Sequence, residues 1–110
     1  MNGLGLTEVQ LDLIRGVLAR HPEVTGAVVF GSRAKGTAAP ASDVDVALEG
    51  IDDPLRAAGI AGELEELPLP FAFDVVALAA IRHLPLREHI ARVGVRVYGA
   101  GEAGGGGAMR

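Results

Sequence analysis

The sequence predicts one small α/β domain in which helices pack on a sheet. Segments with apolar residues at helical spacing alternate along the chain with short apolar runs rich in β-branched residues. Pro and Gly separate most of these segments, and the composition, with 49% hydrophobic and 22% charged residues, is typical of a globular protein. The expected order is helix, strand, helical turn, strand, helix, strand, helix, strand.

The first helix is expected to begin at Thr7, because Thr7 and Gln10 have the spacing of a capping box. Pro22 ends this helix, since proline cannot continue the backbone hydrogen bonds. The apolar residues that recur at roughly helical spacing between these limits are Val9, Leu11, Ile14, Val17 and Leu18.

A buried strand is predicted over residues 24–30, which form a short apolar run. Gly31 and Ser32 break this run. A helical turn is expected from Ser32 to about Gly36, followed by a loop over residues 37–42.

The next strand, predicted over residues 43–48, has two different faces. Alternation places Val44, Val46 and Leu48 on a dry face. The opposite face then carries Asp43, Asp45 and Ala47.

The second half of the chain repeats the alternation of helix and strand. Asp52 or Asp53 caps a helix that has Pro54 at its first position and runs to about Leu67. The remaining predicted elements are a strand over residues 71–78, a helix that Pro85 opens, and a strand over residues 95–98. The residues leave the pairing direction of the strands open.

Residues 1–99 are expected to form the domain, and residues 100–110 a glycine-rich, disordered tail. The net charge of −4 argues against non-specific binding to nucleic acid, which needs a basic surface. The chain contains no Cys, no apolar run long enough to span a bilayer and no N-terminal pattern of a signal peptide. We therefore expect a cytoplasmic protein.

Two carboxylates, Asp43 and Asp45, lie two residues apart on the predicted strand and therefore on one face. Their charges repel, and a hard divalent cation would remove that repulsion. The pair is thus a candidate metal site, although exposed acidic pairs without a metal are common.

The turn at Gly31 and Ser32 is a candidate phosphate site, because free backbone N–H groups and a hydroxyl at a helix start bind anions. The alternative is an ordinary turn between a strand and a helix. Arg33 and Lys35 follow, and their charges either neutralise phosphates or form a solvated surface pair; Arg33 is the stronger candidate because its planar fork suits phosphate.

Asp74 lies between Phe73 and Val75 in a strand that is otherwise apolar. A buried carboxylate is costly unless it is paired or bound to a metal. If this strand neighbours residues 43–48, Asp74 can join the other two carboxylates; otherwise it is a cap or an edge residue.

These residues resemble the motif of the DNA polymerase β-like nucleotidyltransferase superfamily, and FGSRAKGTAAPASDVDVAL is similar to its minimal nucleotidyltransferase (MNT) branch. The similarity continues through FAFDVVAL and REHIARVGVRVYG and covers roughly residues 7–99. It implies the polymerase β-like fold with a small mixed sheet.

The resemblance also implies the chemistry. Asp43, Asp45 and Asp74 would hold Mg²⁺, two ions in the family, and Asp74 would help to activate the attacking hydroxyl. Gly31, Ser32 and Arg33 would bind the nucleotide. The reaction would transfer a nucleoside monophosphate, usually AMP from ATP, to an acceptor hydroxyl.

Family members of this size resemble antitoxins or catalytic subunits that work with a helical-bundle partner of the HEPN type. Three hypotheses follow: an antitoxin that adenylylates a HEPN toxin, a subunit that adenylylates a small molecule, and a module that binds a partner without catalysis. The presence of all three carboxylates argues against the third. The glutamates Glu63, Glu65 and Glu66 are interpreted as a solvated helix face.

Overall fold

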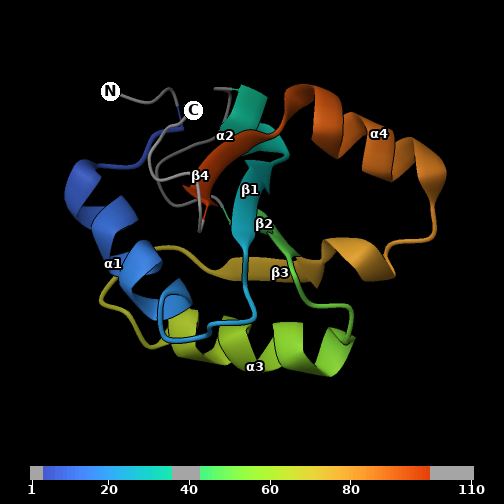
Figure 1. Ribbon diagram of the computed structural model, residues 1–110. Coiled ribbons are helices and arrows are strands. Elements are labelled where there is room, and N and C mark those ends of the chain that lie inside the picture. Colours follow the sequence, from blue (N-terminus) through green and yellow to red (C-terminus); the bar gives the residue numbers. More distant parts are fainter. Residues whose placement is uncertain (1–3, 36–42, 100–110) are drawn as a thin grey trace, which may run out of the picture.

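Figure 1 shows the computed structural model of the chain, in which residues 4–35 and 43–99 are described. One sheet with the strand order β3-β2-β1-β4 forms its centre. In chain order the elements are α1 (Glu8–Leu18), β1 (Gly26–Phe30), α2 (Ser32–Lys35), β2 (Val44–Glu49), α3 (Pro54–Glu65), β3 (Phe73–Ala77), the 3₁₀ helix η1 (Leu78–Ala80), α4 (Leu84–Val93) and β4 (Val95–Gly99). The predicted α/β class and the predicted order of helices and strands are confirmed.

The start of α1 agrees with the sequence. The Thr7 hydroxyl accepts a hydrogen bond from the backbone N–H of Gln10 at 3.0 Å, and the Gln10 side chain accepts one from the N–H of Thr7 at 3.0 Å. Four of the five apolar residues assigned to the buried face are buried. Val9 is the exception and is 69% exposed, because it lies in the first turn, away from the sheet.

Two strands are shorter than predicted. β1 begins at Gly26 rather than at residue 24, because the backbone N–H of Val24 donates to the carbonyl of His21 in a turn. β3 ends at Ala77, and η1 replaces the last predicted strand residue. The loop predicted over residues 37–42 and the tail predicted over residues 100–110 lie outside the described residues.

The sheet is mixed. β1 pairs antiparallel with β2 and with β4, whereas β2 pairs parallel with β3. A parallel pair needs a long crossover connection, and α3 supplies it between β2 and β3. The helical crossover through α3 thus accounts for the parallel direction of the β2–β3 pair, which the sequence left open.

The two faces of the sheet are covered unequally. α1 and α3 pack on one face and enclose the main core, to which β2 contributes Val44, Val46 and Leu48, each at most 1% exposed. α4 covers the other face through a smaller cluster built on Val28 and Ile90. Figure 1 shows α3 along the lower side of the sheet and α4 at the opposite, upper side. The dry face predicted for β2 is confirmed, and part of its second face stays uncovered by helix.

Both edge strands receive a hydrogen bond from a helix side chain. The Glu65 carboxylate of α3 accepts from the backbone N–H of Phe73 in β3 at 2.7 Å, and Arg15 Nε of α1 donates to the Val97 carbonyl in β4 at 2.8 Å. The interpretation of Glu65 as a merely solvated residue is therefore wrong. The loop after α3 brings β3 back alongside the end of that helix, within reach of Glu65.

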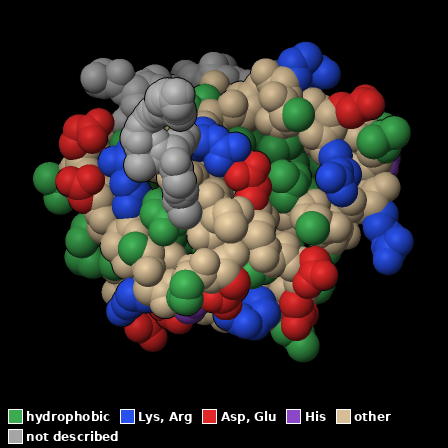
Figure 2. Space-filling view, viewed as in Figure 1, with side chains coloured by type: hydrophobic (Ala, Val, Ile, Leu, Met, Phe, Trp, Pro, Cys, Tyr) green, Lys and Arg blue, Asp and Glu red, His purple; other side chains and the backbone are tan. Residues whose placement is uncertain are grey.

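The helices of the described part of the chain are all too short or too polar to cross a membrane. On the face seen in Figure 2, acidic and basic side chains are interspersed, and neither sign dominates.

Candidate active site

Asp45 and Asp74 lie side by side on neighbouring strands. In the parallel pair β2 and β3, Asp45 is the register partner of Asp74, so both side chains leave the same face of the sheet. Asp43 directly precedes β2, two residues before Asp45. The strand order on which the sequence argument depended is thus observed: β3 neighbours β2, and Asp74 lies beside Asp45.

The three carboxylates differ in their surroundings. Asp45 is half-buried, whereas Asp43 and Asp74 are exposed. Burial raises the pKa of Asp45, and the negative charges of Asp74 and then Asp43 raise that pKa further. The exposure of Asp74 corrects one premise of the sequence argument: its strand is the sheet edge, so its carboxylate is not forced into an apolar interior.

Gly31 brings the turn after β1 into contact with Asp45. Phe30 is the register partner of Asp45 across the antiparallel pair, so the turn begins directly beside this carboxylate. Gly31 has a φ of +77°, and a Cβ atom at this position would collide with Asp45 Oδ2. Glycine is required here both for the backbone conformation and for the close approach.

Arg33 contacts the N-terminal segment. Its side chain is 1% exposed, and Nη1 donates to the backbone carbonyls of Leu4 and Gly5 at 3.3 and 3.2 Å. The guanidinium therefore binds the N-terminal segment in this structure, and its predicted contact with a nucleotide stays a prediction. Ser32 and Lys35 belong to α2, in which the side chains of these two residues are not described.

The chemistry of the donor set fits a hard cation. Carboxylate oxygens are the ligands that Mg²⁺ prefers, and the neighbouring charges of Asp74 and Asp43 add to the effect of burial in raising the pKa of Asp45. Within residues 4–35 and 43–99, no three acidic, His or Cys side chains form a ready-made cage for an ion. Mg²⁺ usually takes only one or two protein carboxylates and completes its shell with water and phosphate, so an open arrangement suits a metal that arrives with a nucleotide.

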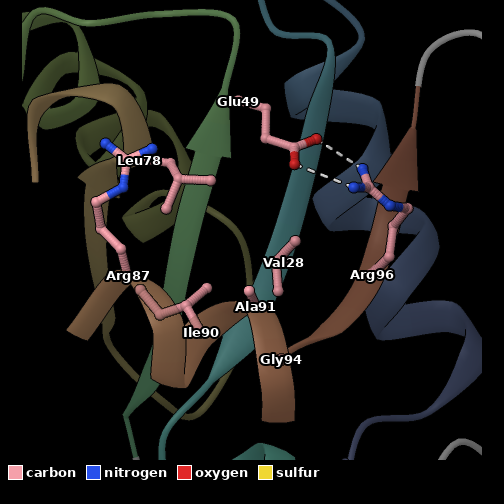
Figure 3. Close-up of a pocket in the computed structure, with 8 residues that line it drawn as sticks. All are labelled: Val28, Glu49, Leu78, Arg87, Ile90, Ala91, Gly94 and Arg96. Atoms are coloured by element: carbon pink, nitrogen blue, oxygen red, sulfur yellow. Dashed lines mark hydrogen bonds and ion pairs between the residues drawn. The ribbon is translucent and has the colours of Figure 1, made fainter. Parts of the chain in front are cut away.

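A second hollow lies on the same face of the sheet, beside α4. It has a volume of about 400 Å³ and an apolar floor that includes Val28 and Ile90. Figure 3 shows Arg87 on one side and, on the other, Glu49 paired with Arg96 through two hydrogen bonds of 2.7 and 3.0 Å. Sequence reasoning missed this group; the alternation of β2 places Glu49 on the face of Asp45, but nothing local marks Arg96 as its partner.

Comparison with known proteins agrees with this arrangement. The family model "Polymerase beta, Nucleotidyltransferase" matches residues 13–103. No curated protein sequence matches the chain.

Several solved structures share the fold. A toxin–antitoxin complex with AMP-PNP contains a chain that is 23% identical, with a TM-score of 0.68 over 89% of this chain and 77% of that one. The complex of a tri-AMPylated HEPN toxin with its MNT antitoxin from Shewanella oneidensis gives 20% identity and a TM-score of 0.66 over 89% and 76% of the two chains. A nucleotidyltransferase-like protein from Sulfolobus solfataricus is 16% identical, with a TM-score of 0.54 over 84% and 78%.

At these identities the solved structures establish the fold alone, and the family model establishes membership. The predicted resemblance is confirmed by a match that spans all four strands of the sheet and includes Gly31, Asp43, Asp45 and Asp74. The chain belongs to the polymerase beta nucleotidyltransferase family.

Proposed function

We propose that this nucleotidyltransferase transfers AMP from ATP, with Mg²⁺, to a hydroxyl of a HEPN-type partner protein, and that it thereby acts as an antitoxin. The observation that carries the proposal is the register pairing of Asp45 with Asp74, directly beside the turn at Gly31. This places an acidic cluster against a glycine turn that allows close approach of a ligand.

Each part of the site has a role in this proposal. Asp43, Asp45 and Asp74 hold Mg²⁺, most simply as two ions, and the backbone at Gly31 and Ser32 holds the triphosphate. When bound, Mg²⁺ would stabilise the negative charge on the attacking hydroxyl oxygen and on the leaving pyrophosphate. We leave Arg33 out of this group, because its guanidinium is buried against Leu4 and Gly5.

The transfer is a displacement at the α-phosphorus of ATP. The acceptor oxygen forms a bond to this phosphorus, the bond to the oxygen that bridges to the β-phosphate breaks, and pyrophosphate leaves with the bonding electrons. The hydroxyl proton passes to a base and then to water. Asp74 is the proposed base, because it is exposed at the sheet edge, where an acceptor can reach it.

The choice of a protein as the acceptor rests on the solved structures that share this fold. Three of them are described as toxin–antitoxin or MntA–HepT complexes, and in one the HEPN toxin carries AMP groups. A partner of this kind would present the hydroxyl that receives AMP.

The test is to incubate the chain with Mg²⁺, labelled ATP and the protein product of the neighbouring gene. We expect label on the partner, loss of labelling with EDTA and loss of labelling with Asp45→Asn. Asp52→Asn, which removes an exposed carboxylate outside the cluster, should label normally.

Two outcomes contradict the proposal. A tight complex without labelling, in which Asp45→Asn still neutralises the toxin, would favour partner binding without catalysis. Labelling of a small molecule but not of the protein would favour the small-molecule acceptor.

A further inference from the structure

Arg33 occupies an unusual place for a charged residue. It follows the Gly31–Ser32 turn by one position, yet its side chain is 1% exposed. Nη1 is shared between the carbonyls of Leu4, at 3.3 Å, and Gly5, at 3.2 Å. Burial also lowers the pKa of the guanidinium, which shows that the group is withdrawn from water.

The same guanidinium contacts the segment that leads into β3. Its central carbon lies 4.9 Å from the centre of the Phe71 ring, within the range of a cation–π contact. Phe71 packs edge-on against Phe73, with ring centres 5.5 Å apart, and Phe73 directly precedes Asp74. One side chain thus connects the proposed phosphate turn, the N-terminal segment and the strand that carries a proposed metal ligand.

The backbone conformation of Gly5 and its lack of a side chain leave room for the Arg33 guanidinium. Its φ is +75°, and a Cβ atom there would lie 2.9 Å from Arg33 Nη1. The flanking residues Leu4 and Leu6 are 2% and 4% exposed, so the segment is anchored in the main core on both sides of this glycine. The N-terminal segment therefore offers carbonyl groups from a fixed position.

Stability alone is a poor explanation for this arrangement. Removing a guanidinium from water is costly, and hydrogen bonds to two neutral carbonyls offset only part of that cost. A planar cation that must meet two carbonyls and a ring at once accepts only a narrow range of arrangements. The guanidinium is thus suited to fixing the relative positions of the three segments.

We propose that Arg33 is a positioning residue for nucleotidyl transfer, holding the Gly31–Ser32 turn in place against Phe71 and the strand of Asp74 from inside the molecule. The inference rests on the proposed function for its catalytic consequence. It assigns Arg33 no contact with the nucleotide. The residue acts through the turn and the strand that it joins.

The test compares Arg33→Met with the wild-type chain. Met keeps much of the buried volume, so the urea midpoint of unfolding should stay the same or rise, whereas kcat should fall by about tenfold to a hundredfold, as small misplacements of reacting groups do. KM for ATP should change less than kcat. Hydrogen exchange should accelerate at the amides of residues 31–35 and 71–74.

Gly5→Ala and Phe71→Leu provide milder versions if Arg33→Met does not fold. Each of these two substitutions should lower kcat in the otherwise wild-type chain. Neither should lower kcat further when it is combined with Arg33→Met, because all three changes break one set of contacts. Ile60→Val, which removes a methyl group from the buried side of α3, is the control for loss of packing and should leave kcat and the exchange of residues 31–35 unchanged.

Wild-type kcat and wild-type exchange in Arg33→Met would overturn the inference. Its failure is distinguishable from failure of the proposed function, because hydrogen exchange requires no substrate. A wild-type chain that transfers no AMP, with accelerated exchange in Arg33→Met, would contradict the proposed function and leave the anchoring role of Arg33 supported.

Discussion

Asp45 lies in the proposed active site, where its negative charge is unfavourable for folding. Its carboxylate is half-buried next to two other carboxylates, and both its burial and their charges raise its pKa. Because the pKa in the folded state lies above that in the unfolded state, Asp45 favours folding when protonated, and this contribution is lost as the pH rises through the folded-state pKa. At neutral pH the ionised Asp45 therefore opposes folding.

We expect Asp45→Asn to raise the melting temperature at pH 7 in EDTA while abolishing AMP transfer. The gain should shrink as the pH falls through the raised pKa of Asp45, because the carboxyl group is then protonated in the wild-type chain as well. Thermal unfolding at a series of pH values measures this. Asp52→Asn should show no comparable gain, and a lower melting temperature for Asp45→Asn at pH 7 would contradict the argument.

The negative charges of the three carboxylates also predict that Mg²⁺ affects the melting temperature. Mg²⁺ with ATP should raise the melting temperature of the wild-type chain, because a ligand that binds only the folded state stabilises it. EDTA should reverse the rise, and Asp45→Asn should reduce it. An equal rise in Asp45→Asn would show that the nucleotide binds elsewhere.

Gly31 is the second residue whose identity the site requires. Gly31→Ala would place a side chain in the left-handed region, at a cost of about 1–2 kcal/mol, and would also displace the Asp45 carboxylate. We expect lower stability by chemical denaturation together with loss of AMP transfer.

Gly16→Ala is the matched control. Gly16 lies in α1, and a Cβ atom there would meet nothing within 4 Å. Alanine should stabilise the helix by about 0.5–1 kcal/mol with activity unchanged. If Gly31→Ala and Gly16→Ala changed stability and AMP transfer equally, Gly31 would have no special role in the site.

At the scale of elements, β3 depends on a helix side chain for one of its amides. Glu65→Ala removes the acceptor of the Phe73 N–H, and we expect a loss of about 1 kcal/mol, the typical net value of one hydrogen bond. Glu66→Ala, at the exposed neighbouring position, is the comparison. Hydrogen exchange at Phe73 should accelerate in the first variant only.

The elements also show what local sequence patterns determine. The alternation in residues 43–48 predicted the dry face of β2, and the capping box predicted the start of α1, because both depend on neighbours within a few residues. Strand order stayed open at the level of the sequence, and the pairing of Asp45 with Asp74, which depends on it, is given by the structure.

Contacts between distant residues could not be predicted in this way. Arg33 meets a carbonyl 29 residues away, and Glu49 meets Arg96 47 residues away. Their partners are determined by the folded chain and not by any pattern near them. No pattern near these residues therefore indicated the contacts of Arg33 with the N-terminal segment or of Glu65 with Phe73.

At the scale of the whole molecule, the two hydrophobic clusters predict unequal local stability. The main core joins both long helices to the sheet, whereas α4 is held by a small cluster around Ile90. Leu18→Ala should therefore cost about 2–5 kcal/mol of global stability, as cavities in a main core do.

Ile90→Ala should instead accelerate hydrogen exchange mainly within α4, with a smaller change in the free energy of global unfolding. Exchange and urea denaturation on the two variants measure the difference. Uniform acceleration throughout the sheet in Ile90→Ala would show that the two clusters unfold as one unit.

The hydrogen bonds between helix side chains and the two edge strands affect how the protein can bind other molecules. Glu65 and Arg15 each occupy a main-chain group that an extended peptide would otherwise use to join the sheet. Addition of a foreign strand is therefore disfavoured at both borders, which guards against fibril-like growth when no partner is present. Contacts with another protein are therefore expected to involve side chains and not added main-chain pairing.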